Sequence, residues 1–239
     1  MKTIWCFGDS WTWGSELWDN SICDENDAKA KYGFDYSYKH MPNHAYVEKN
    51  RWSAILTSHG EFSVSNYGIP GSTNEIILDT IIDTVSNTAL PDVAIIAWTT
   101  QTRKSAKLDD WKDGCPIKDR FKIVDSPASR DENFHLDFYK EVIIANSILK
   151  KCKVINLNAF HKNISYLPFD NEIYFAKDTL LSVATNGAYK EIMEYTENIH
   201  WFFYKSLANT HENLKKIGHP NEKGHALIAD YIAKEIKQL

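Results

Sequence analysis

The chain has 239 residues, of which 43% are hydrophobic and 25% are charged, and its formal net charge at pH 7 is −5. These values are ordinary for a soluble globular protein and exclude a disordered or collagen-like chain. A nucleic-acid-binding protein normally carries a basic balance or a dense stripe of lysine and arginine, whereas the lysines here are scattered among acids. We therefore expect no nucleic-acid partner. Since no linker is visible, residues 1–239 are expected to form one domain.

Four cysteines, at positions 6, 23, 115 and 152, lie far apart without a CxxC pair or a spacing typical of zinc ligands. We interpret them as reduced thiols of a cytosolic protein and expect neither a metal nor another cofactor. The first apolar run is too short for the core of a signal peptide, and no later run approaches the length that crosses a membrane. A cytoplasmic protein without a membrane partner is the resulting expectation.

The first part of the chain predicts two strands and two helices. Residues 3–7 form a short apolar run that Gly8 ends, which is typical of a buried parallel strand. Residues 51–59 predict a short helix, and residues 62–66 alternate as a second strand. Between residues 73 and 87 the apolar side chains recur at the spacing of one helix face, which predicts a longer helix.

The remaining elements continue the alternation of strands and helices. Residues 93–98 are a continuous apolar run, as expected for a central strand covered on both faces. Residues 134–149 predict a helix, and residues 154–157 predict a fourth strand. The last helix is predicted to have Pro220 at its first position and Glu222 in its first turn.

Three polar stretches interrupt this pattern and are interpreted as loop insertions at about residues 19–50, 101–130 and 158–198. The first is long enough for a lid, and the third is predicted to end in a helix over residues 189–198. Strands that alternate with helices predict an α/β protein, in which a doubly wound parallel sheet lies between two helical layers.

Ligands of a doubly wound sheet gather at the carboxyl ends of its strands, so the residues after each strand are the first candidates for chemistry. The segments at these places, together with the one before the last helix, are Phe7-Gly8-Asp9-Ser10, Asn66-Tyr67-Gly68-Ile69-Pro70-Gly71, Trp98-Thr99-Thr100-Gln101 and Gly218-His219-Pro220.

In this order the segments resemble the blocks of the SGNH, or GDSL, hydrolases, and the resemblance spans nearly the whole chain. It implies a flavodoxin-like SGNH fold with Ser10 as the nucleophile and His219 as the general base. Gly71 is implied to lend a backbone N–H to the oxyanion hole. A serine hydroxyl is a weak nucleophile until an adjacent imidazole takes its proton, so this pair is the minimum for acyl transfer.

Two departures from the family pattern leave roles open. The third block usually reads Gly-x-Asn-Asp, but here Ala97-Trp98-Thr99-Thr100 stands in its place. Thr99 is the first candidate to replace the missing amide, with Gln101 and Asn74 as weaker ones. The family also places an aspartate three residues before the histidine, where this chain has Lys216. A Ser-His dyad steered by a backbone carbonyl and an acid from elsewhere in the chain are both compatible with the sequence.

Each of these residues also has a structural interpretation. Asp9 and Ser10 could cap a helix after a glycine turn, and His219 could cap the last helix. Arg103 is interpreted either as a clamp for an acidic substrate or as a salt-bridge partner of an insertion. His225 is expected to face solvent or to pack locally.

The sequence thus predicts a serine ester hydrolase acting on small acyl esters, with a carbohydrate O-deacetylase as the first hypothesis. The tryptophans of the first segment, Trp5, Trp11, Trp13 and Trp18, are interpreted as core or as a wall on which a sugar could stack. The alternative is a catalytically impaired protein of the same fold that binds a glycan. The missing asparagine and aspartate favour this alternative, whereas the retained Ser10 and His219 speak against it.

Overall fold

The computed structural model describes residues 1–15, 17–24, 42–99, 104–107, 121–124, 133–160, 173–188, 211–215 and 218–238. Four parallel strands form its main sheet in the order β2-β1-β3-β6. Their bounds are β1 Lys2–Phe7, β2 Phe62–Asn66, β3 Val93–Trp98 and β6 Lys153–Asn158. The four strands predicted from the apolar runs are all present, and β3 is buried at each of its six residues, as expected for a central strand.

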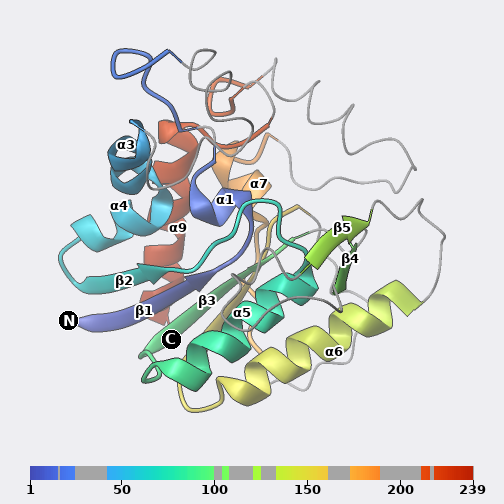
Figure 1. Cartoon of the computed structure of the whole chain (residues 1–239). Helices are drawn as coiled ribbons and strands as arrows, with labels where there is room; N and C mark the ends of the chain where they lie inside the picture. The colour runs from blue at the N-terminus through green and yellow to red at the C-terminus, as the bar shows by residue number, and fades with distance from the viewer. Residues whose placement is uncertain are drawn as a thin grey trace.

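Helices cover both faces of this sheet (Figure 1). On one face, α4 (Trp52–Ser58) packs against α9 (Glu222–Gln238), and α7 (Leu180–Ala184) packs against α9. On the other face, α5 (Asn74–Asn87) packs against α6 (Asn133–Ile148). This arrangement confirms the predicted three-layer α/β architecture.

The period of two in a strand explains why a central strand such as β3 contributes to two cores. Along β3, Val93, Ile95 and Ala97 join the core under α4, α7 and α9, whereas the alternate residues join the core under α5 and α6. The alternate residues are Ala94, Ile96 and Trp98. The first core also contains Trp52 and Ile228, and the second contains Ile77, Ile81, Phe138 and Val142.

The predicted loop insertions contain secondary structure that the sequence pattern did not reveal. Helix α3 (His44–Asn50) lies in the first insertion, an antiparallel pair of strands, β4 (Lys104–Lys107) and β5 (Phe121–Val124), lies in the second, and α7 lies in the third. These elements are four to seven residues long, which is too short for the hydrophobic period of a helix or a strand to be recognised in the sequence. The helix predicted over residues 189–198 falls outside the described residues.

The start of the last helix differs from the prediction. Helix α9 begins at Glu222, so Pro220 precedes the helix instead of occupying its first position. The side-chain oxygen of Asn221 accepts hydrogen bonds from the backbone N–H groups of Lys223, at 3.0 Å, and Gly224, at 3.1 Å. Asn221 therefore caps the helix, because it satisfies N–H groups that have no partner inside the first turn.

Within the described part of the chain, no helix has both the length and the apolar character to cross a membrane. Cys6, Cys23 and Cys152 are free thiols, and Cys115 lies outside the described residues. Cys6 is completely buried in the core of the sheet, and this burial raises the pKa of its thiol. A buried thiol of this kind behaves as a small apolar side chain.

Candidate active site

Ser10 opens a single helical turn directly after the first strand. The turn, α1 (Ser10–Trp13), is capped by Asp9, whose carboxylate accepts from the backbone N–H of Trp11 at 3.0 Å. The change from strand to helix is tight, since a Cβ on Gly8 would lie 2.1 Å from the hydroxyl oxygen of Thr12. The glycine before Asp9 is therefore required by close packing, and it fixes where the Ser10 side chain emerges.

His219 meets Ser10 although 209 residues separate them in the sequence. Its Nε2 atom lies 2.8 Å from the Oγ atom of Ser10, within hydrogen-bonding distance. The loop that carries the imidazole is fixed by a hydrogen bond from the backbone N–H of Lys215 to the carbonyl of His219, at 2.7 Å. Since Ser10 and His219 are both only partly buried, the pair is accessible from solvent.

Glu222 is the acidic residue nearest to His219 in the sequence, and its carboxylate has other partners. Glu222 follows His219 closely, but its carboxylate accepts from the hydroxyl of Tyr46 at 2.8 Å and lies 3.4 Å from the ammonium of Lys215. Lys216, at the position where the family has its aspartate, lies outside the described residues.

The loop after β2 is bonded directly to the Ser10 turn. The backbone N–H of Tyr67 donates to the carbonyl of Cys6 at 2.8 Å, and that of Ile69 donates to the carbonyl of Gly8 at 2.9 Å. A Cβ on Gly68 would lie 2.8 Å from the backbone nitrogen of Trp13, so only glycine permits this close contact. The loop also carries Gly71, and it thereby ties this residue to the turn that carries Ser10.

Two backbone donors of this region have no acceptor within the described part of the chain. No hydrogen bond from the N–H of Ser10 or of Gly71 to a described acceptor is formed. Gly71 adopts a φ of +78°, a left-handed conformation that glycine reaches without steric cost. As far as the described residues go, both N–H groups are therefore available to bind an oxygen atom of a ligand.

A buried network of three polar side chains joins the Ser10 turn to the end of β3. The hydroxyl of Thr99 donates to the second carboxylate oxygen of Asp9 at 2.8 Å. The backbone N–H of Thr99 donates to the amide oxygen of Asn74 at 2.9 Å, and Asn74 is the first residue of α5. The three residues are each no more than 3% exposed. Asp9 accepts the only hydroxyl hydrogen of Thr99, so the Thr99 side chain has no donor left for a ligand. The geometry therefore favours Asn74 over Thr99 as the residue that replaces the family's missing amide.

Asn74 retains donor capacity in this network. Its amide nitrogen lies 3.4 Å from the carbonyl of Thr99, which is long for a hydrogen bond, and an amide carries two N–H groups. Gln101 and Arg103, the other candidates that the sequence suggested near the end of this strand, lie outside the described residues.

A second histidine, His225, lies near the Ser-His pair. The sequence was compatible with its exposure to solvent and with local packing. His225 does not face solvent, because it is completely buried on α9. Its Nδ1 accepts from the backbone N–H of Trp52 at 3.3 Å, and no described residue forms a hydrogen bond with its Nε2. Burial, followed by the charges of His219 and Arg51, lowers the pKa of His225 to about 3, so its imidazole is neutral at physiological pH.

The helical period contained the signal for this burial. His225 precedes Ile228 by three residues and Ile232 by seven, and both isoleucines are completely buried. Arg51 belongs to no motif and was not among the residues predicted from the sequence. Its guanidinium lies 5.6 Å above the Trp13 ring and 2.5 Å from the carboxylate of Glu48, and burial lowers its pKa.

The cluster of tryptophans near Ser10 belongs mainly to the core. Trp5, Trp11 and Trp18 are at most 7% exposed, so these three do not form a wall on which a sugar could stack. Trp13 is partly exposed, but Arg51 covers its ring. Tryptophans in a short amphipathic segment more often fill a core than line a site, because they bury large apolar areas.

No group of three or more His, Cys, Asp and Glu side chains that could hold a metal ion occurs in the ranges that the structure describes.

The chain was compared with known proteins in three ways. No family model matches it, and no curated protein matches it. Among solved structures, a family two carbohydrate esterase from Clostridium thermocellum, solved in complex with cellohexaose, is 14% identical with a TM-score of 0.50. The match covers 99% of this chain and 64% of that one.

Two further structures match over almost the full length of both chains. A member of the lipolytic protein G-D-S-L family from Veillonella parvula is 16% identical, with a TM-score of 0.46 and 99% of each chain covered. A psychrotrophic esterase from Pseudoalteromonas sp. is 14% identical, with a TM-score of 0.45, and the match covers 100% of this chain and 98% of that one. The chain shares its α/β fold with the family two carbohydrate esterase from Clostridium thermocellum.

Proposed function

We propose that the protein is a serine ester hydrolase in which Ser10 is the nucleophile and His219 is the general base. The observation that carries this proposal is the 2.8 Å contact between the Oγ atom of Ser10 and the Nε2 atom of His219. In this mechanism Oγ attacks the ester carbonyl carbon while its proton passes to Nε2. The imidazolium then protonates the departing alcohol, and a water molecule hydrolyses the acyl-enzyme by the same two proton transfers.

The negative oxygen of the tetrahedral intermediate is stabilised by hydrogen-bond donors around the Ser10 turn. We assign the backbone N–H groups of Ser10 and Gly71 to this role, with the side-chain amide of Asn74 as a third donor. The free state of the two N–H groups within the described part of the chain supports the assignment. The orientation of Asn74 supports it as well, because its amide oxygen is held by the N–H of Thr99.

Replacing Asn74 with alanine tests the third donor. Loss of one oxyanion donor lowers kcat by about 10²–10³ in serine hydrolases. We expect a fall of this order in kcat with little change in KM, because the interaction forms only in the transition state. Thr57→Ala, at an exposed position of α4, serves as a matched control for the loss of a polar side chain. A kcat of wild-type size in Asn74→Ala would remove Asn74 from the oxyanion hole.

The substrate that we propose is a small acyl ester on a carbohydrate, with an acetyl group as the acyl part. The similarity in fold to a carbohydrate esterase that was solved with cellohexaose supports this choice. The alternative, a binding protein of this fold without turnover, is less favoured, since a site used for binding alone has no need of a hydrogen-bonded Ser-His pair.

Hydrolysis of p-nitrophenyl acetate by the wild type, Ser10→Ala and His219→Ala, with a chelator present, tests the proposal. We expect both variants to lose at least about 10³ in kcat, because residues that act as one unit cost similar amounts when removed singly. Acetylated xylan and acetylated glucomannan then test the carbohydrate assignment by release of acetate. Wild-type hydrolysis that persists unchanged in Ser10→Ala would contradict the proposed nucleophile.

A further inference from the structure

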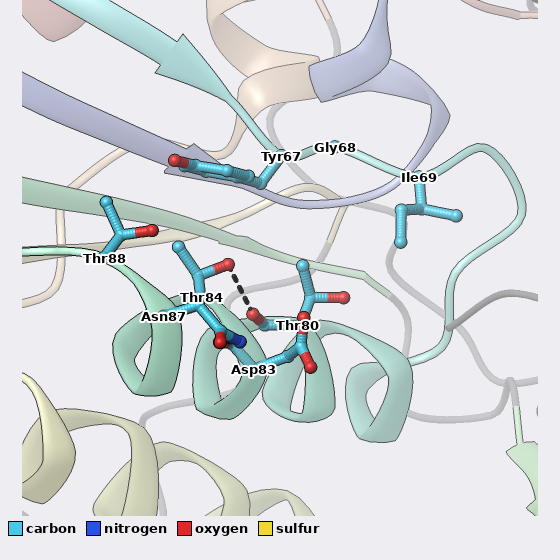
Figure 2. A pocket seen from close by; sticks show the side chains of 8 residues that line it. All are labelled: Tyr67, Gly68, Ile69, Thr80, Asp83, Thr84, Asn87 and Thr88. Atoms are coloured by element: carbon cyan, nitrogen blue, oxygen red, sulfur yellow. Dashed lines mark hydrogen bonds between the residues drawn. The ribbon is translucent and has the colours of Figure 1, made fainter. Parts of the chain in front are cut away.

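A hollow lies on the surface beside the loop that follows β2, and the described residues that line it include neither Ser10 nor His219. It has a volume of about 320 Å³ and opens between the Tyr67–Ile69 segment and the face of α5 that carries Thr80 and Thr84 (Figure 2). Small-molecule sites in proteins start at about 300 Å³. The hollow is therefore large enough for one small ligand, and it is not part of the proposed active site.

One wall of the hollow is an aromatic ring that is held in place from behind. The ring of Tyr67 stacks on that of Phe7 with 5.3 Å between centroids and 17° between planes, and it meets the edge of Trp5 at 5.7 Å. Tyr67 is only partly buried, and Figure 2 shows its ring extending over the α5 residues that form the opposite wall. A fixed, partly exposed ring offers an apolar surface that costs little conformational entropy when a ligand binds.

The opposite wall offers hydrogen-bond acceptors. The hydroxyl groups of Thr80 and Thr84 donate to carbonyls of their own helix at 2.7 Å, so their hydrogens are already used. The amide nitrogen of Asn87 donates to the carbonyl of Asp83 at 2.8 Å, which leaves the amide oxygen of Asn87 exposed. The carboxylate of Asp83 forms neither an ion pair nor a hydrogen bond with any described residue. At this wall the Asp83 carboxylate and the Asn87 amide oxygen can accept hydrogen bonds from a ligand, and the hydroxyl of Thr88 can donate one.

We propose that this hollow binds one sugar residue of a glycan. A pyranose has a face of C–H groups that packs on an aromatic ring, and its hydroxyl groups are donors for the Asp83 carboxylate and the Asn87 amide oxygen. A cation would be bound better by several aromatic faces around it, whereas Tyr67 is the one aromatic side chain among the described residues that line the hollow. The inference goes beyond the proposed function, because binding here requires no chemistry at Ser10.

Saturation-transfer NMR with the full chain tests the site, using methyl β-D-glucopyranoside, methyl α-D-mannopyranoside and N-acetylglucosamine as probes and choline as the cationic comparison. We expect binding of at least one sugar to the wild type, and an increase of about fivefold or more in its Kd for Asp83→Asn, which removes a charged acceptor. Asp83 is exposed, so this variant is expected to fold and to hydrolyse p-nitrophenyl acetate at the wild-type rate. Asp230→Asn changes another exposed helical aspartate far along the chain and is expected to leave the Kd unchanged.

Tyr67→Phe removes the hydroxyl group and keeps the ring. This variant is expected to retain most of the affinity for the sugar, since the stacking face is kept. Absence of saturation transfer to every sugar would overturn the proposal. An unchanged Kd in Asp83→Asn, or equal weakening in Asp230→Asn, would also overturn it, and preferential binding of choline would make the hollow a cation site. These outcomes are independent of ester hydrolysis, so failure of this site and failure of the proposed function are distinguishable.

Discussion

Replacing His225 with asparagine is expected to reduce the dependence of protein stability on pH between about pH 7 and pH 4.5. His225 is completely buried, and its Nδ1 accepts from the backbone N–H of Trp52. Burial, together with the nearby His219 and Arg51, lowers its pKa from 6.5 to about 3. An asparagine oxygen can replace Nδ1 as the acceptor, but the amide does not titrate in this range.

The sign and size of the effect follow from proton linkage. Between pH 6.5 and pH 3 the unfolded chain binds a proton at His225 that the folded chain does not bind, so the free energy of unfolding falls as the pH falls. The stability that depends on a neutral His225 is therefore fully present above pH 6.5. At about 1.4 kcal/mol per pH unit, the difference between pH 7 and pH 4.5 is about 2.5 kcal/mol.

Urea unfolding followed by tryptophan fluorescence at the two pH values measures this difference. When the pH is lowered from 7 to 4.5, the free energy of unfolding of His225→Asn is expected to fall by about 2.5 kcal/mol less than that of the wild type. This difference does not depend on the stability of the variant at pH 7. His59→Asn is the control, because His59 is exposed beside Asp230 on the surface and is expected to leave the dependence close to that of the wild type. Equal dependence in the wild type and His225→Asn would refute the account of a neutral buried imidazole.

Two further variants test the packing around the Ser10 turn. Thr99→Val removes the hydroxyl that donates to the buried carboxylate of Asp9, and it is expected to lower the free energy of unfolding in urea by about 1–3 kcal/mol. Thr57→Val, whose hydroxyl donates to a carbonyl of its own helix at an exposed position, is expected to cost much less, and equal losses would contradict the role of the network. Gly8→Ala places a Cβ 2.1 Å from the Thr12 hydroxyl and is expected to lower both stability and kcat/KM, whereas adding Thr12→Ala restores part of each. Wild-type kcat/KM in Gly8→Ala would show that the turn adapts without displacing the nucleophile.

The sequence predicted the strands and long helices because their burial is periodic. The run at residues 93–98 is apolar throughout since β3 faces a core on both sides, and the spacing in residues 73–87 reflects the single buried face of α5. Short elements inside polar segments escaped detection, because a helix such as α3 completes fewer than two turns and its stability depends on tertiary contacts.

The long-range contacts of the site followed only partly from the sequence. The order of strands and their following loops was sufficient to bring Ser10 and His219 to the same edge of the sheet, in agreement with their 2.8 Å contact. The bond between Thr99 and Asp9 joins residues 90 positions apart, and local pattern cannot reveal which polar group a hydroxyl selects. For the same reason the sequence ranked Thr99 above Asn74 as a candidate donor.

The most direct test of the proposed serine hydrolase is covalent labelling of the wild type with a fluorophosphonate, followed by peptide mass spectrometry. The account predicts one modified residue, Ser10, with labelling abolished in Ser10→Ala and strongly slowed in His219→Ala, because the imidazole must accept the hydroxyl proton. Labelling that is absent from the wild type, or that persists at the same rate in His219→Ala, would contradict the central claim.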